Sequence, residues 1–146
     1  MRILGLDVGD KTIGVSLSDE LLISANGITT IERVGSRKDA NKILDLVREY
    51  NCKRIVIGLP LSFDGSDSIQ TKKVREFSRL LENKMRSTGL HKVEVILYDE
   101  RFTTLMAERV LIEADLSREK RKTVIDKQAA VIILQDYLNS ILNEEH

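Results

Sequence analysis

The spacing of apolar residues changes along this chain, and the order of the changes limits the folds that the chain can adopt. Three short apolar segments come first, at residues 3–8, 12–17 and 24–31, and their composition is typical of β-strands. Gly9 and Asp10 stand between the first two segments, where they predict a hairpin turn. The chain therefore begins with antiparallel strands.

After these strands the pattern alternates between helix and strand. Ser36 begins the first predicted helix, and Asp39, three residues later, is its expected capping partner. Strands are expected at residues 54–58 and 93–98, and the helix between them is expected to end at Gly89. Strand–helix–strand units of this kind predict parallel strands joined by right-handed crossovers.

The last third of the chain is predicted to be helical. Thr103 or Thr104 would cap one helix, and the final helix is expected to start near Val124, after a charged stretch at residues 117–122. The apolar stripe of the final helix contains Ala130, Ile133, Leu134, Tyr137, Leu138 and Ile141. The order of elements predicts an α/β fold, with a mixed β-sheet flanked by α-helices. No linker or repeat interrupts the pattern, so we expect one domain over residues 1–146.

Charge and composition restrict the functions open to the chain. The 23 Lys and Arg residues balance 23 Asp and Glu residues, which argues against indiscriminate binding to nucleic acid but allows a local basic surface. Aromatic residues make up 4% with no Trp, so a broad base-stacking platform is not expected. The single cysteine, Cys52, indicates a reducing compartment. No signal peptide or membrane-spanning stretch is recognised, so we expect a cytoplasmic protein without a membrane partner.

Carboxylates stand at the ends of two predicted strands. Asp7 lies at the end of the first strand, and alternation places it on one face with Ile3. Asp99 and Glu100 directly follow a later strand, and only one of the two can point along the face of Asp7. Each acid also has a simpler interpretation, as a turn residue or as a solvated loop acid.

Asp126 is placed in the first turn of the predicted final helix. Ala130, Ile133 and Tyr137 follow it at i+4, i+7 and i+11, so it shares the stripe that is expected to pack on the sheet. An acid at this position is either a rim charge favoured by the helix dipole or a ligand directed inward.

Two strand ends and one helix start can converge at a single edge of the sheet. Three carboxylates brought close together repel each other, and a divalent cation relieves that repulsion. Ligation by oxygen alone suits Mg²⁺ or Mn²⁺, whereas His91 and His146 lack zinc-ligand spacing. The acids therefore predict a site for Mg²⁺ or Mn²⁺.

Four stretches resemble, in the same order, motifs of the YqgF family, also called RuvX-like, in the RNase H-like superfamily. They read LGLDVGDKTIGVSLSD, IVIGLPLSFDGS, YDERFTT and VIDKQAAVIILQDYL, and with the chain between them they span nearly the whole sequence. The resemblance implies an RNase H-like fold with an acidic metal site. It carries Asp7, Glu100 and Asp126 over as catalytic and metal-binding residues, with Asp99 as the reserve candidate for the middle ligand.

The resemblance also implies a nuclease that hydrolyses phosphodiester bonds with metal assistance. The sequence departs from the RuvC resolvases at two positions: Gly58-Leu59-Pro60 stands where they carry a glutamate, and Ala129 stands where they have a further acid. These departures favour structured RNA over a DNA junction. We therefore expect processing of the 5′ end of pre-16S rRNA during ribosome biogenesis, with ribosomal precursor particles as partners.

Basic residues close to the acids are candidates for phosphate contacts. They are Lys11, Arg101, Arg118, Lys120, Arg121 and Lys122. A run of charges such as the last four is more often a solvated surface than a binding site.

The sequence leaves three alternatives open. A Holliday junction resolvase acting in DNA recombination would need a two-fold dimer to cut symmetric strands. A non-catalytic nucleic-acid-binding module in ribosome assembly would need no metal. An actin-like ATPase or sugar kinase shares the hairpin DVGDKTIG, but the chain is short for two related domains and has no second glycine-rich loop.

Overall fold

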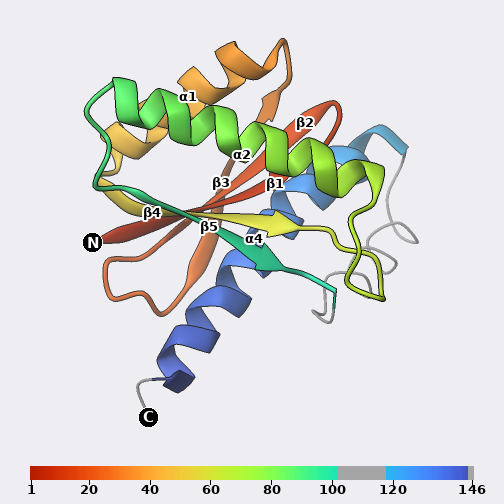
Figure 1. Cartoon of the computed structure of the whole chain (residues 1–146). Helices are drawn as coiled ribbons and strands as arrows, with labels where there is room; N and C mark the ends of the chain where they lie inside the picture. The colour runs from red at the N-terminus through yellow and green to blue at the C-terminus, as the bar shows by residue number, and fades with distance from the viewer. Residues whose placement is uncertain (102–117, 145–146) are drawn as a thin grey trace.

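The computed structural model describes residues 1–101 and 118–144, and this part of the chain forms a five-stranded sheet with helices on both faces (Figure 1). The elements in chain order are β1 (Arg2–Val8), β2 (Thr12–Ser18), β3 (Ala25–Glu32), α1 (Ser36–Glu49), β4 (Cys52–Leu59), α2 (Ile69–Ser87), β5 (Glu94–Asp99) and α4 (Arg118–Glu144). No helix among these residues combines the length and the apolar character needed to cross a membrane.

The sheet has the strand order β3-β2-β1-β4-β5. β1 and β2 pair antiparallel, as do β2 and β3, whereas β1 pairs parallel with β4 and β4 pairs parallel with β5. The predicted mixed sheet is thus confirmed. Because β1, β4 and β5 run in the same direction, their carboxyl ends meet at one edge of the sheet.

Alternation along the strands sorts side chains between two layers. Leu4, Leu6 and Val8 of β1 pack in the core cluster with α1 and α2. On the opposite face, Ile3 and Val56 pack against α4. The buried residues of the α4 stripe are Ala129, Ala130, Ile133, Leu134, Tyr137 and Leu138. The predicted stripe of the final helix is therefore confirmed as the one that packs on the sheet.

The predicted capping role of Asp39 is wrong. Helix α1 begins at Ser36 as expected, but its N-cap residue makes no side-chain capping hydrogen bond. Asp39 is fully buried and accepts hydrogen bonds from Val34 N at 3.1 Å and from Arg33 Nε at 3.0 Å. Arg33 Nη1 also donates to the carbonyl of Gly9 at 2.9 Å. A charge-assisted bond to a buried carboxylate is stronger than a neutral cap, so Asp39 pairs with Arg33 and ties α1 to the β1–β2 hairpin.

The predicted start of the final helix is also wrong. α4 is already helical at Arg118, well before Val124. The residues between are mostly Arg, Glu and Lys, which are good helix formers, so the charged stretch joins the helix. Asp126 consequently lies about two turns inside α4, beyond the reach of the helix dipole. The helix expected after Thr103 or Thr104 lies outside the described residues.

Gly5 sets how closely α4 approaches the sheet. A Cβ at this position would meet Ser16 Oγ and would lie 2.8 Å from Leu134 Cβ and 3.2 Å from the carbonyl oxygen of Ala130. Ser16 Oγ donates a hydrogen bond of 2.7 Å to the same Ala130 carbonyl. The missing side chain thus allows a buried hydrogen bond between β2 and α4.

We predict that Gly5→Ala lowers the free energy of unfolding by about 1–3 kcal/mol, because the added methyl group overpacks this contact. Gly27→Ala is the matched control, since the three atoms nearest to its Cβ would all belong to the side chain of Lys127, which is flexible and can move. Chemical denaturation of both variants checks the prediction. Equal midpoints for the two would show that Gly5 does not limit the approach of α4.

Candidate active site

Asp7 lies near the carboxyl end of β1, on the face that α4 covers. It is 8% exposed and pairs with Gly14 of β2. Leu6 pairs with Ile57 in the parallel ladder, so the next residues of the two strands, Asp7 and Gly58, are neighbours in the sheet. The predicted face of Asp7 is therefore the observed one. Burying a carboxylate to this degree is costly unless the surroundings compensate its charge.

Glu100 lies directly beyond β5 on the same face. Its backbone N–H donates to the carbonyl of Leu59 at 3.3 Å, which extends the parallel pairing beyond the strand. Its Oε2 atom is buried, and a Cβ at Gly58 would meet both this oxygen and Cδ1 of Ile133. The carboxylate of Glu100 thus occupies the space over Gly58, which is the neighbour of Asp7.

Asp99 is held in a different way. Arg101 Nη2 lies 2.8 Å from Asp99 Oδ2, and the backbone N–H of Arg101 donates to Asp99 Oδ1 at 3.0 Å. The hydrogen bonds from the Arg101 guanidinium hold the pKa of the Asp99 carboxyl below its usual range. The structure therefore separates the two acids that strand alternation left open: Glu100 lies beside Gly58, and Asp99 pairs with Arg101.

Gly58 is a residue whose role the sequence did not reveal. In the sequence it is part of Gly58-Leu59-Pro60, the stretch where the RuvC resolvases carry a glutamate. A side chain at this position would collide with Glu100 and Ile133. The signal was present in the sequence as a glycine within a buried strand, which often marks a close approach by another group. Gly58 thus leaves room for the carboxylate of Glu100, and an acidic side chain at position 58 would take up that room.

Asp126 lies on α4, but the side chains of residues 118–126 are outside the described part of the structure. This holds also for Arg118, Lys120, Arg121 and Lys122. The helix itself is placed: Ala130 contacts the strand position of Gly5, and Ile133 that of Gly58. Asp126 precedes these two residues on the same stripe by about one and two turns. The backbone of α4 therefore runs along the face that carries Asp7 and Glu100.

The two remaining basic candidates differ in their surroundings. Lys11 is exposed in the β1–β2 hairpin, and its carbonyl accepts a hydrogen bond of 2.9 Å from the backbone N–H of Arg33. Arg101 pairs with Asp99 and also donates through Nη1 to the carbonyl of Phe63 at 3.3 Å. Arg101 therefore ties the end of β5 to the loop that follows β4.

The hairpin after Asp7 is also fixed from the α2 side. Gln70 Nε2 donates to the carbonyl of Val8 at 3.1 Å, and Lys73 Nζ lies 3.2 Å from Asp10 Oδ1. These contacts come from the first turns of α2. The carboxyl end of β1 is thus held on both faces of the sheet, by α2 on one side and by the packing of α4 on the other.

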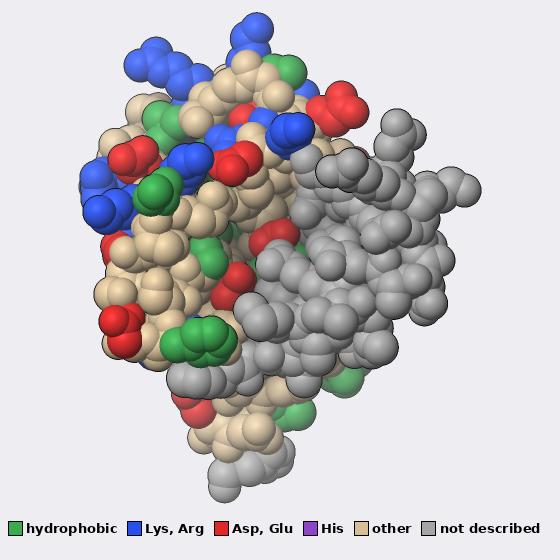
Figure 2. Space-filling view, turned by 90° about the vertical axis from the view of Figure 1, so that its right-hand side faces the viewer, with side chains coloured by type: hydrophobic (Ala, Val, Ile, Leu, Met, Phe, Trp, Pro, Cys, Tyr) green, Lys and Arg blue, Asp and Glu red, His purple; other side chains and the backbone are tan. Residues whose placement is uncertain are grey.

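The arrangement suits a hard divalent cation. Figure 2 looks onto the side of the molecule where β4 and β5 end, and it shows acidic side chains in a hollow, with many Lys and Arg side chains toward the upper left. Among the described residues there is no group of three His, Cys, Asp or Glu side chains that could hold a metal ion. Asp7 and Glu100 supply two carboxylates, and the carboxylate of Glu100 lies in the space that Gly58 leaves open. Carboxylate oxygens are ligands that Mg²⁺ prefers.

We predict that Arg101→Met raises the pKa of Asp99 toward its ordinary value. A carboxyl with a lowered pKa stabilises the fold above its unfolded pKa, and this stabilisation is lost as pH falls through the lowered value. Asp19 is the internal control, because its pKa is lowered by the backbone N–H groups of Ile23 and Ser24. NMR titration of both carboxyls checks this. An unchanged pKa of Asp99 in the variant would contradict the pairing.

Known proteins resemble this chain in sequence along its length. The model of the RuvX family, described as Holliday junction resolvase, matches residues 1–140. A protein of Clostridium tetani is 46% identical over 144 residues, covering 99% of this chain and 100% of the relative. One from Caldanaerobacter subterraneus subsp. tengcongensis is 50% identical over 144 residues, covering 98% and 99%. Both relatives carry the name "Putative pre-16S rRNA nuclease".

Two solved structures share the fold. RuvC of T. thermophilus in complex with a Holliday junction substrate has a TM-score of 0.61 at 11% identity, covering 97% of this chain and 96% of that one. The Fowlpox virus resolvase in complex with Holliday junction DNA has a TM-score of 0.57 at 13% identity, covering 97% and 99%. The mixed sheet is therefore of the RNase H-like type, and the chain belongs to the RuvX family of nucleases.

Proposed function

We propose that this protein is a metal-dependent nuclease that hydrolyses phosphodiester bonds of structured RNA and processes the 5′ end of pre-16S rRNA. The observation that carries the proposal is the carboxylate of Glu100 over Gly58, beside the buried Asp7, at the edge where three parallel strands end. Membership of a nuclease family supports hydrolysis, and the name of the curated relatives supports the substrate. Processing of this RNA would place the protein in the cytoplasm.

In this proposal Asp7, Glu100 and Asp126 hold Mg²⁺ or Mn²⁺. The metal, when bound, lowers the pKa of a water molecule and stabilises charge on the phosphate. The chain contributes fixed positions: the burial of Asp7 limits the movement of its carboxylate, and Gly58 leaves Glu100 its place. Lys11 and Arg101 would contact phosphates at the rim, and the basic residues of α4, Arg118, Lys120, Arg121 and Lys122, would contact the RNA backbone.

A second candidate is the cleavage of four-way DNA junctions. The description of the family and the fold shared with two junction-bound resolvases favour it. Two positions argue for RNA instead. Gly58-Leu59-Pro60 stands where the RuvC resolvases carry a glutamate, and Ala129, where they have a further acid, is fully buried against the sheet. We therefore rank structured RNA first.

We predict Mg²⁺-dependent cleavage of a pre-16S rRNA fragment, with slower or no cleavage of a matched four-way DNA junction. Asp7→Asn should lower the rate by about 100-fold or more, because a charged group that stabilises the transition state is lost. Asp10→Asn is the control from the same hairpin, since Asp10 is exposed and pairs with Lys73. Cleavage assays with Mg²⁺ and with chelator measure both effects. Near-normal turnover by Asp7→Asn, or undiminished cleavage in chelator, would refute the metal site. Cleavage of the DNA junction but not of the RNA would favour the second candidate, a junction-cleaving nuclease.

We also predict that Mg²⁺ raises the melting temperature through the same residues. At about 100 times its Kd, a metal that binds only the folded state adds about 2.7 kcal/mol, or about 5–11 °C at this chain length. Glu100→Gln and Asp126→Asn should reduce this shift, whereas Asp99→Asn should keep it because Asp99 pairs with Arg101. Melting curves with chelator and with Mg²⁺ measure the shift. If Mg²⁺ raised the melting temperature of Glu100→Gln fully but not that of Asp99→Asn, Asp99 and not Glu100 would be the metal ligand.

A further inference from the structure

Phe63 presents an aromatic ring to solvent in the loop between β4 and α2. Its exposed fraction is 74%. The other described aromatic side chains have partners: Phe77 is buried in the core, and Tyr98 packs edge-to-face with Tyr137 at 6.0 Å between ring centroids. Tyr50 lies under the guanidinium of an arginine. Among the described aromatic residues, Phe63 is thus the one whose ring is left in water.

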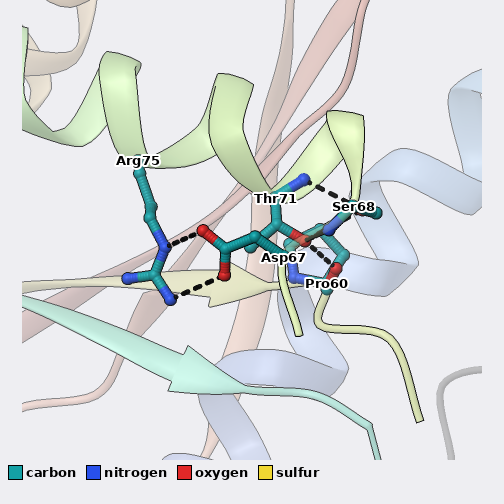
Figure 3. Close-up of polar contacts among 5 residues, drawn as sticks. All are labelled: Pro60, Asp67, Ser68, Thr71 and Arg75. Atoms are coloured by element: carbon teal, nitrogen blue, oxygen red, sulfur yellow. Dashed lines mark hydrogen bonds and ion pairs between the residues drawn. The ribbon is translucent and has the colours of Figure 1, made fainter. Parts of the chain in front are cut away.

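The base of this loop is fixed by side-chain contacts to α2 (Figure 3). Thr71 Oγ1 donates to the carbonyl of Pro60 at 2.5 Å, and Thr71 N donates to Ser68 Oγ at 3.2 Å in a capping box. Arg75 binds both carboxylate oxygens of Asp67, at 2.9 and 3.1 Å. The chain therefore enters and leaves the loop at set positions.

The tip of the loop is ordered as well. Ser62 N donates to the carbonyl of Ser66 at 2.9 Å, and Gly65 N donates to the carbonyl of Ser62 at 2.8 Å. Gly65 has a φ of 88°, a conformation that favours glycine. Arg101 Nη1 donates to the carbonyl of Phe63 itself. An exposed ring on a loop held at so many points is preorganised, so a ligand would bind it without first ordering the chain.

The loop also leaves the sheet at the candidate active site. Arg101, which holds Phe63, directly follows Glu100 in the chain. The backbone of Glu100 in turn binds Leu59, the last residue of β4 before the loop. The exposed ring therefore belongs to the same edge of the sheet as the carboxylates of Asp7 and Glu100.

We propose that Phe63 stacks on an unpaired base of the nucleic-acid substrate and so positions the strand at the acidic site. This inference rests on the proposed function, because it requires a nucleic acid at this edge. Every base offers a π-face, and in RNA the unpaired bases of loops and ends are those free to stack on aromatic side chains. A single ring also agrees with the low aromatic content, which disfavours a broad stacking platform.

Fluorescence tests the contact directly, because the chain contains no Trp. Phe63→Trp introduces the sole indole, and Leu21→Trp is the matched control at a side chain that is 77% exposed in the connection between β2 and β3. Both are titrated with an RNA hairpin that has an unpaired loop and with a fully paired RNA duplex, with Ca²⁺ replacing Mg²⁺ to slow cleavage. We expect the hairpin to quench Phe63→Trp and to leave Leu21→Trp unchanged. Equal responses of the two variants, or no quenching, would overturn the proposal.

Affinity separates stacking from simple apolar contact. Phe63→Ala and Phe63→Leu should both weaken binding of the hairpin by about 5- to 150-fold, whereas Phe63→Tyr should bind like the wild type. Binding of the duplex and the melting temperature should stay the same in all three, since the ring is exposed. Wild-type affinity in Phe63→Leu would overturn stacking.

The outcomes also separate this inference from the proposed function. If the wild type cleaves pre-16S rRNA and Phe63→Ala binds and cleaves it equally well, only this inference fails. If the wild type cleaves no nucleic acid but RNA still quenches Phe63→Trp, only the proposed function fails.

Discussion

The close approach of α4 to the sheet is the constraint on which the candidate site depends. It occurs at two glycines on one face. Gly5 leaves room for the hydrogen bond between Ser16 and the Ala130 carbonyl, and Gly58 leaves room for Ile133 together with the carboxylate of Glu100. Larger residues at these positions would push the helix outward. The backbone of α4 would then no longer run close to the strand ends that carry Asp7 and Glu100.

The opposite layer fixes the backbone segments that leave this edge. Arg33 and Gln70 bind carbonyls of the β1–β2 hairpin, and Thr71 binds the carbonyl of Pro60 where the loop after β4 begins. The site is thus built between two layers. α4 covers the face with the carboxylates, while α1 and α2 hold the turns that connect the strands.

Much of this architecture follows from local sequence patterns. Alternation placed Asp7 on the face of Ile3, and helical spacing identified the α4 stripe, because both depend on the periodicity of a single element. The role of Asp39 could not be predicted in the same way, since its partner Arg33 lies outside the helix and also binds the carbonyl of Gly9 in the β1–β2 hairpin. The early start of α4 was missed because a charged run carries no apolar stripe, although its residues favour helix.

The candidate site, too, could be predicted from local sequence patterns only in part. Alternation allowed one of Asp99 and Glu100 to face Asp7 but could not decide between them at the end of a strand. Two contacts decide their placement, the ion pair of Asp99 with Arg101 and the space over Gly58. In the sequence, Gly58 belonged to a stretch that lacks the glutamate of the RuvC resolvases, and no pattern singled out Phe63. Their positions depend on neighbours that are distant in the chain or that belong to another element.

The central claim is that Asp7, Glu100 and Asp126 surround one metal position on the face covered by α4. Crystals grown with Mn²⁺ and measured at the manganese absorption edge test it most directly, because the anomalous signal locates the ion without reference to activity. We predict an anomalous peak beside the carboxylate of Glu100, bound by carboxylate oxygens of these three residues. A peak coordinated by Asp99 instead of Glu100, or manganese bound only elsewhere on the protein, would contradict the account.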